Sequence, residues 1–458
     1  MDFQTVNPAT GEAIRDWTRM DREEVFSVAQ AAHDTFESWR RLSPAERAPY
    51  FVRLAEVLET NRDRWAELVT EEMGKTITES RGEIEKCAWM SRFYAEQAPG
   101  WLEDRSVEAD GERHLVAFEP LGVILSVMPW NYPFWQALRF AVPGLIAGNA
   151  SLLKHASNVT GCAFAIESAF READFPDDLF RTIVPDYDTV AALLASDLIQ
   201  GVSLTGSTAA GETIGELAGR NLKKCVLELG GSDPFIVLED ADVEVAARGA
   251  VAGRMVGTGQ SCIASKRFIV VEAVAEDFTE RFAALMAEQE LGDPMDPETR
   301  VGAIVNEEAL EELLAQIEDS VADGARVLCG GRRGPGPGYF LEPAVVADVT
   351  PEMRLFREEV FGPVAPVTVV PDERAAVALA NASEFGLGGS VWTRDLDRGV
   401  RIARAIESGT LFVNSFTKSD PRMPFGGVKR SGLGRELSEY GLKEFVNVKG
   451  INVYNHGD

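Results

Sequence analysis

Short apolar runs alternate with helical patterns from Leu121 onward, and this alternation limits the folds open to the chain. The first series of runs comprises 122–128, 151–154, 180–184, 201–205 and 225–229. The second series begins at Phe235 and continues through 268–271, 364–370, 389–392 and 410–413. Buried strands that alternate with helices are typical of parallel sheets covered by helices. We therefore expect an α/β fold with two such units, which join near 230–231.

The part of the chain before Leu121 shows a different pattern. Apolar residues at helical spacing predict helices over 22–41, 44–73 and 77–101, the second with Ser43 as its N-cap. The segment 330–338, rich in glycine and proline, is expected to be a loop. A chain of 458 residues is long enough for about two to four domains.

The composition excludes several classes of partner. Acidic residues outnumber basic ones by 73 to 45, and the formal net charge is −28, so nucleic acid is not an expected partner. We find no secretory leader and no apolar run long enough to cross a bilayer, so no membrane partner is expected and the expected location is cytoplasmic. The acidic, lysine-poor composition suits a salt-loving host and equally an ordinary acidic protein.

The five cysteines are scattered without Cys-x-x-Cys pairs or Cys/His clusters. This spacing argues against a disulfide framework and against a metal site. Cys262 differs from the others because it ends the glycine-flanked turn 257–262, which can present a side chain to a cleft. A thiol attacks as thiolate and needs a base nearby, and Glu228 is a candidate. On the cysteine alone, a buried inert thiol is the alternative.

Five segments together resemble the aldehyde dehydrogenase superfamily and occur in its order. They are Pro-Trp-Asn-Tyr-Pro at 129–133, Leu-Glu-Leu-Gly-Gly at 227–231, Gly-Gln-Ser-Cys at 259–262, Glu-Glu-Val-Phe-Gly-Pro at 358–363, and Pro-Phe-Gly-Gly-Val-Lys at 424–429 with its continuation to Glu436. The resemblance implies a Rossmann-type cofactor-binding domain at 1–105 and 120–230, a catalytic domain at 231–423, and a β-strand oligomerisation arm at 106–119 and 437–458. It also implies a homo-oligomer, either a dimer or a tetramer.

A glycine pattern at 205–211 follows an apolar strand and opens a helix, where backbone N–H groups can face a pyrophosphate. An ordinary strand-to-helix turn would show the same pattern. The resemblance makes Gly206 and Ser207 contacts of NAD or NADP. It implies further cofactor contacts at Pro129, Trp130, Lys154, Ser157, Leu229, Glu359 and Phe361.

Ser157 departs from the acidic residue that is common at the matching place in the family. A carboxylate there would bond the ribose hydroxyls of the adenosine and repel a 2′-phosphate, so Ser157 removes that repulsion. We therefore expect NADP to be accepted as well as NAD, with the preference between them left open.

The resemblance implies a mechanism for an aldehyde substrate. Cys262 attacks the carbonyl, and the Asn131 amide and the Cys262 backbone N–H stabilise the oxyanion. Hydride transfer then gives a thioester, for whose hydrolysis Glu228 is the general base. Acyl-CoA-forming relatives generally lack this glutamate, so a free acid is the expected product.

Three segments, 153–158, 225–235 and 425–432, look most like the succinate-semialdehyde dehydrogenases of compact bacterial type. A substrate with a second carboxylate needs a cation, and arginine suits that role. The expected substrate residues are Arg139, Lys418, Arg422 and Phe425. Two alternatives stay open: the same chemistry on an uncharged or phosphorylated aldehyde with Arg139 structural, and a non-enzymatic cofactor-binding protein on the same fold.

Overall fold

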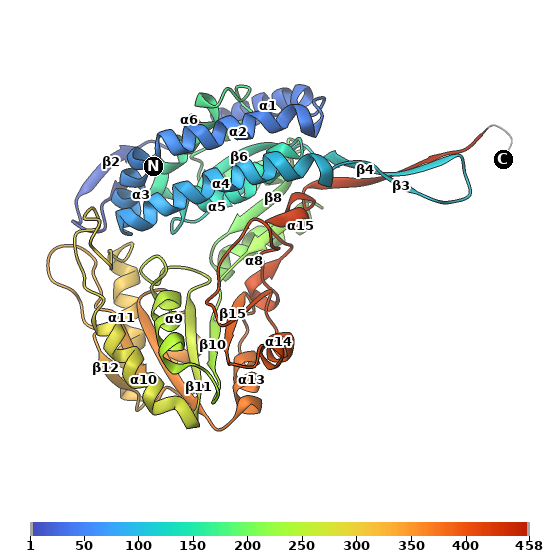
Figure 1. Cartoon of the computed structure of the whole chain (residues 1–458). Helices are drawn as coiled ribbons and strands as arrows, with labels where there is room; N and C mark the ends of the chain where they lie inside the picture. Colours follow the sequence, from blue (N-terminus) through green and yellow to red (C-terminus); the bar gives the residue numbers. More distant parts are fainter. Residues whose placement is uncertain (1–2, 456–458) are drawn as a thin grey trace.

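The computed structural model describes residues 3–455, whose strands form sheets of six, seven, three and two strands. Residues 1–2 of the expected cofactor-binding domain and residues 456–458 of the expected arm lie outside the described part. Helices and parallel sheets alternate as the sequence predicts, so the α/β class is confirmed (Figure 1). The assignment of separate roles to the three expected domains stays a prediction.

The six-stranded sheet has the order β17-β9-β8-β5-β6-β7 and is parallel except for its edge strand β17. Its strands are β5 (Val123–Met128), β6 (Ala150–His155), β7 (Phe180–Thr182), β8 (Ile199–Thr205), β9 (Lys224–Glu228) and β17 (Gly432–Leu433). Because the chain runs outward from β5 to β7 and then crosses to β8, the strand order reverses between β5 and β8. Ligands of open α/β sheets bind at such a switch point, beyond the carboxyl ends of the strands.

The seven-stranded sheet has the order β12-β13-β14-β11-β10-β15-β16 and is parallel except for β12. Its strands are β10 (Asp233–Val237), β11 (Ser265–Val271), β12 (Arg326–Cys329), β13 (Ala344–Ala347), β14 (Val364–Val370), β15 (Gly388–Trp392) and β16 (Thr410–Val413). The sequence prediction missed β12 and β13, which are short and form one edge. Such short runs give too little periodicity to identify a strand.

Most helices cover the two large sheets. They are α1 (Arg22–Trp39), α2 (Pro44–Thr60), α3 (Arg62–Met73), α4 (Ile77–Trp101), α5 (Pro133–Ile146), η1 (Ser157–Val159), α6 (Thr160–Glu172), α7 (Tyr187–Ala195), α8 (Thr208–Arg220), α9 (Val243–Met255), α10 (Glu272–Ala287), α11 (Glu307–Ala322), α12 (Arg354–Arg357), α13 (Glu373–Asn381), α14 (Leu396–Ala405), η2 (Lys429–Ser431) and α15 (Ser438–Leu442). The single helix expected over 44–73 is wrong, because the chain breaks at Asn61. The Asn61 side chain donates to the Val57 carbonyl at 3.0 Å and so ends α2.

A hairpin of β1 (Phe3–Val6) and β2 (Ala13–Trp17) precedes the first helix and was not predicted. Most of its residues are exposed or half-buried, so the apolar alternation of a strand is weak there. Trp17 stacks on Phe164 of α6 with ring centroids 5.5 Å apart. The hairpin therefore lies against the first sheet's helices, and the segment after it reaches the edge of that sheet.

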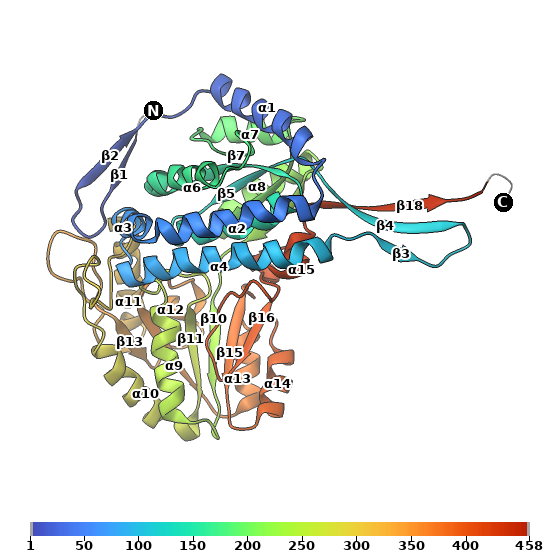
Figure 2. The ribbon, with the colours of Figure 1, turned by 45° about the horizontal axis from the view of Figure 1, so that its top comes forward.

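The third sheet pairs β4 (Arg113–Pro120) with β18 (Val446–Val453) over their whole lengths and carries β3 (Arg105–Val107) on its other side. Figures 1 and 2 show these strands projecting away from the rest of the molecule. They coincide with the strand-like stretches of the expected arm.

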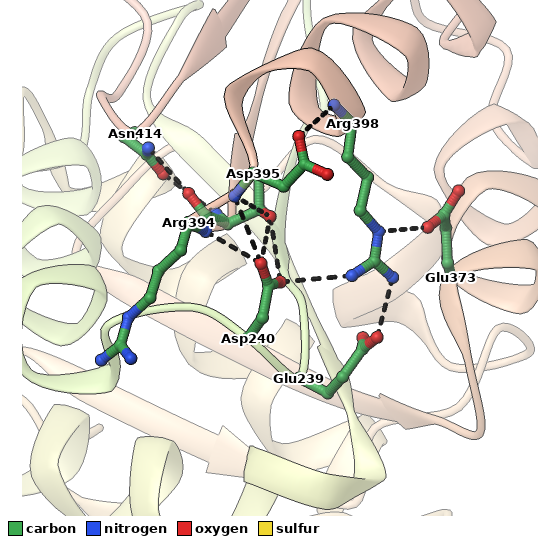
Figure 3. A network of polar contacts seen from close by, with 8 residues as sticks. Glu239, Asp240, Glu373, Arg394, Asp395, Arg398 and Asn414 are labelled. Atoms are coloured by element: carbon green, nitrogen blue, oxygen red, sulfur yellow. Dashed lines mark hydrogen bonds and ion pairs between the residues drawn. The ribbon is translucent and has the colours of Figure 1, made fainter.

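Arg398 of α14 joins several elements at the carboxyl end of β10 (Figure 3). Its guanidinium donates to Glu373 at 2.6 Å, Glu239 at 2.9 Å and Asp240 at 3.3 Å. Asp240 also accepts from the Thr393 hydroxyl at 2.7 Å. This network fixes α13 and α14 at one end of the second sheet and leaves the opposite end, where β10 and β11 begin, to face the first sheet.

Candidate active site

Cys262 lies in the loop between α9 and β11, shortly before β11 of the seven-stranded sheet begins at Ser265. Gly257, Thr258 and Gly259 have φ values of 62°, 58° and 75°, a left-handed run that favours glycine. A Cβ at Gly259 would lie 2.4 Å from the Gly362 backbone, so only glycine fits that position. This turn aims the thiol back toward the first sheet.

Hydrogen bonds hold the nucleophile loop from two sides. Glu79 of α4 accepts from the Gly257 N–H at 2.7 Å. The buried Gln260 side chain donates to the Ala303 carbonyl at 3.0 Å and accepts from the Val305 N–H at 2.9 Å. These hydrogen bonds hold the loop that carries Cys262, and their partners come from residues that are far from Cys262 in the sequence.

The pKa of the half-buried Cys262 thiol is raised to about 12. Burial is the main cause, and the nearby charges of Arg139 and Lys266 only partly oppose it. Lys266 donates to the carbonyls of Ser261 at 2.8 Å and Cys262 at 2.7 Å. At neutral pH the resting site therefore holds a protonated thiol rather than a thiolate.

Glu228 ends β9, is 2% exposed, and has no hydrogen-bond partner for either carboxylate oxygen among the described residues. Burial raises its pKa well above the usual range, and the neighbouring Glu436 raises it further. A Cβ at Gly426 would lie 2.5 Å from Oε1 of Glu228, so the glycine leaves room for this carboxyl group. Such a group is a strong base once it loses its proton.

Asn131 follows β5 and reaches the nucleophile loop, where its amide donates to the Gln260 carbonyl at 3.0 Å. A primary amide has two hydrogens, so one donor is left for a substrate oxygen. Lys75, in the loop before α4, supports this turn by donating to the Asn131 backbone carbonyl at 3.2 Å. The position suits the expected oxyanion role.

Two cavities meet at Cys262 and Gln136, which line both. The first, of about 180 Å³, lies beyond β5 and β8 at the switch point of the first sheet. It brings together most of the expected cofactor residues, namely Pro129, Trp130, Gly206, Ser207, Leu229, Glu359 and Phe361, together with Asn131. The N-terminus of α8 starts at Ser207 there, so its backbone N–H groups suit a pyrophosphate.

The second cavity, of about 220 Å³, lies on the other side of Cys262. Its lining includes three of the expected substrate residues, Arg139, Lys418 and Phe425, with aromatic rings from Tyr132, Trp135 and Phe416. Arg139 is 1% exposed, is ion-paired with Glu436, and lies 4.6 Å from the centre of the Phe425 ring. An aldehyde here would approach Cys262 from the side opposite the first cavity.

The structure places Arg422 outside this second cavity. Its exposed guanidinium pairs with Asp420 at 2.6 Å and lies 5.6 Å from the centre of the Trp89 ring. Glu228, which is buried, lines neither cavity.

Lys154 and Ser157 line a third, smaller cavity of about 80 Å³ at the end of β6. Arg19, which follows the unpredicted hairpin, lines it too and donates to the Pro185 carbonyl at 3.1 Å. Burial lowers the pKa of Lys154, and the positive charge of Arg19 lowers it further, so the two cations lie near one another. Two cations and a hydroxyl suit a phosphate.

Sequence reasoning missed Arg19, Gln136 and Lys86 as cavity residues. Arg19 lies in a stretch with no motif, and only the fold carries it to β6. Lys86 occupies one position of a long amphipathic helix, where lysine is typical of a solvated face. Gln136 follows the Pro-Trp-Asn-Tyr-Pro segment closely, and that nearness was the one available signal.

Comparisons with known proteins agree with this geometry. The model of the family described as "Aldehyde dehydrogenase family" matches residues 1–451. A probable succinate-semialdehyde dehydrogenase [NADP(+)] of Synechocystis is 46% identical over 451 residues, which are 98% of this chain and 99% of that protein. A succinate semialdehyde dehydrogenase [NAD(P)+] of Escherichia coli is 44% identical over 98% of this chain and 97% of its own length.

Among solved structures, the succinic semialdehyde dehydrogenase of Streptococcus pyogenes in complex with NADP+ is similar with a TM-score of 0.96. It shares 37% sequence identity over 99% of this chain and 100% of that chain. No helix within residues 3–455 is both long and apolar enough to cross a membrane.

Alkylation of Cys262 is expected to accelerate steadily with pH. Because its pKa of about 12 lies above the working range, the reactive thiolate fraction should rise about tenfold per pH unit from about pH 7 to about pH 10. The rate of inactivation by iodoacetamide, with the site located by peptide mass spectrometry and Cys262→Ala as control, measures this. A plateau near neutral pH would show a resting thiolate and contradict the prediction.

Proposed function

The chain belongs to the aldehyde dehydrogenase family and is an NAD(P)-dependent oxidoreductase, and we propose that its substrate is a semialdehyde carrying a second carboxylate, succinate semialdehyde in the first place. The observation that carries this proposal is the presence of Arg139 on the wall of the same cavity as Cys262. Relatives named for succinate semialdehyde support it.

The Arg139 guanidinium retains capacity for a ligand despite its ion pair. Its Nε faces Glu436 and its Nη2 lies 3.4 Å from the Thr205 hydroxyl, whereas Nη1 has no protein partner among the described residues. The carboxylate of a short semialdehyde could accept from that nitrogen while its carbonyl reaches the thiol. Burial strengthens such a charge-assisted bond.

The residues of the chain then have distinct roles. Cys262 loses its proton and attacks the carbonyl, while the free N–H of the Asn131 amide stabilises the oxyanion. The residues that line the first cavity would hold the nicotinamide cofactor, which would supply the hydride acceptor beside Cys262. Glu228, in its deprotonated form, takes a proton from the water that cleaves the thioester, which releases the acid and restores the thiol.

We propose that NADP is preferred over NAD. Arg19 and Lys154 contribute two positive charges beside Ser157, and no carboxylate in residues 3–455 lies within 4 Å of either cation. The absence of an acidic residue at 157 removes repulsion, and Arg19 adds attraction toward a 2′-phosphate. The names of the Synechocystis and Streptococcus proteins, which mention NADP, support this preference.

We further propose that the arm joins copies of the chain into a homo-oligomer in the cytoplasm. Strand β18 has an unpaired outer edge in the described part of the chain, and it exposes Val448 and Ile451. An uncovered strand edge with exposed apolar side chains favours pairing with another chain, and the one lysine of β18, Lys449, is paired with Glu119.

The wild-type enzyme should oxidise succinate semialdehyde with a kcat/KM about 100-fold or more above that for butyraldehyde, because the uncharged aldehyde has no carboxylate to accept from Nη1 of the buried Arg139 guanidinium. Arg139→Lys keeps the charge opposite Glu436 but loses the planar fork, so only the semialdehyde should suffer, by about tenfold or more. Initial rates of NADPH formation measure both. Arg422→Met, outside the cavity, is the matched control, and equal losses for both aldehydes would refute substrate contact by Arg139.

Cofactor selection should follow the charges near Ser157. Ser157→Glu is expected to lower kcat/KM for NADP by about 100-fold, and Arg19→Ala by about tenfold, with little change for NAD. Arg15→Ala is the control, because Arg15 is an exposed arginine of the hairpin that precedes Arg19. Parallel losses with NAD and NADP would show that Arg19 only supports the local fold.

Replacing the apolar side chains on β18 should break the assembly. Val448→Lys with Ile451→Lys is expected to give a smaller species in analytical ultracentrifugation, because lysines block strand edges. Val321→Lys is the control. It changes an exposed valine of α11 and should leave the mass of the assembly unchanged. A wild-type monomer would overturn the proposal.

A further inference from the structure

We propose that Lys86 of α4 is a second anchor for the substrate carboxylate, so that Lys86 and Arg139 together select semialdehydes over uncharged aldehydes. This inference rests on the proposed substrate class and adds to it a specificity residue from a different helix. Lys86 lines the same cavity as Cys262 and Arg139.

The Lys86 ammonium is held in one place on the cavity wall. It donates to the Ser419 hydroxyl at 2.7 Å and lies 4.1 Å from the centre of the Trp135 ring. Ser419 belongs to the loop before Pro424, and Trp135 lies one helical turn before Arg139 on α5. An ammonium has three hydrogens, so donors remain for a ligand.

The acidic groups around Lys86 are already engaged elsewhere. Glu83 forms a buried ion pair with Lys75 and accepts from the Trp135 N–H at 2.8 Å. Asp420 pairs with Arg422 at 2.6 Å. Within residues 3–455, no carboxylate lies within 4 Å of the Lys86 nitrogen.

The other charges on this wall are engaged as well. Arg139 has its own counter-ion in Glu436, and Glu79 accepts from the Gly257 N–H. Lys418, the other lysine of the cavity, is exposed and lies 4.4 Å from the Phe416 ring centre. Among the described residues of this cavity wall, Lys86 is therefore the half-buried cation that forms no ion pair within 4 Å.

Burial lowers the pKa of Lys86 to about 8, with the positive charge of Arg139 as the second cause. A carboxylate bound between the two cations would offset both effects and favour the protonated lysine. A ligand carboxylate thus offsets the desolvation of Lys86 and the repulsion between Lys86 and Arg139, whereas an uncharged aldehyde offsets neither.

The test compares Lys86→Met and Lys86→Arg with wild type on succinate semialdehyde and butyraldehyde. Lys86→Met should lower kcat/KM for the semialdehyde by about tenfold or more, mainly through KM, and leave butyraldehyde within about twofold. Lys86→Arg should restore most of the semialdehyde activity because it restores the charge. Arg81→Met, which removes a cation from the same helix outside the cavity, is the matched control.

Ser419→Ala separates an anchor from a residue that only positions the loop. It breaks the lysine's bond to the loop but keeps the ammonium, so selectivity for the semialdehyde should persist. Circular dichroism and NADPH binding by fluorescence check that each variant is folded. Equal losses of Lys86→Met on both aldehydes, or no loss on either, would overturn the anchor.

The wild-type result distinguishes the two levels of the proposal. If wild type prefers the semialdehyde and Lys86→Met keeps that preference, the substrate class stands and the role of Lys86 fails. If wild type does not discriminate between the aldehydes, the carboxylated substrate class fails, and the anchor role fails with it.

Discussion

The burial of Glu228, Glu436 and Arg139 beside one another is the constraint on which the active site depends. One guanidinium charge compensates one carboxylate, and Glu436 takes that ion pair. Glu228 is left without a hydrogen-bond partner among the described residues, and its pKa rises. An unpaired buried charge is costly, so burial raises the pKa of Glu228 and makes its carboxylate a stronger base. Burial of Cys262 likewise raises the pKa of its thiol to about 12.

The two large sheets create this environment by meeting end to end. The carboxyl ends of β5, β8 and β9 supply Asn131, the Gly206 turn and Glu228, whereas the start of β11 supplies Cys262. Each loop is short, so the strands determine where its side chains lie. The first cavity, with the expected cofactor residues, and the second cavity, with the expected substrate residues, then meet at the thiol, and the proposed hydride transfer requires that arrangement.

Helix α4 links the N-terminal helical region to the chemistry. Its first turns bond the nucleophile loop through Glu79 and support Trp135 through Glu83, and Lys86 follows one turn later. The sequence pattern predicts only that α4 packs on the core with one apolar face. In the structure, α4 also forms one wall of the second cavity. This dual use explains why charged residues are buried at helix positions that an amphipathic pattern assigns to solvent.

The sequence by itself determined the α/β class, the strands of both sheet centres and the glycine turn before Cys262, because periodicity and positive φ are local properties of the chain. The expected residues of the first cavity came from the resemblance of the sequence motifs to a known family. It missed the edge strands β12 and β13 and the break at Asn61, where local signals are short or a side chain ends the helix. Only the tertiary structure brought Arg19 to Lys154, paired Arg139 with Glu436 and placed Arg422 outside the cavity. Only the tertiary structure, too, shows that Lys86 has no ion-pair partner within 4 Å in residues 3–455. Those outcomes depend on burial and on charges far apart in sequence, which no local pattern records.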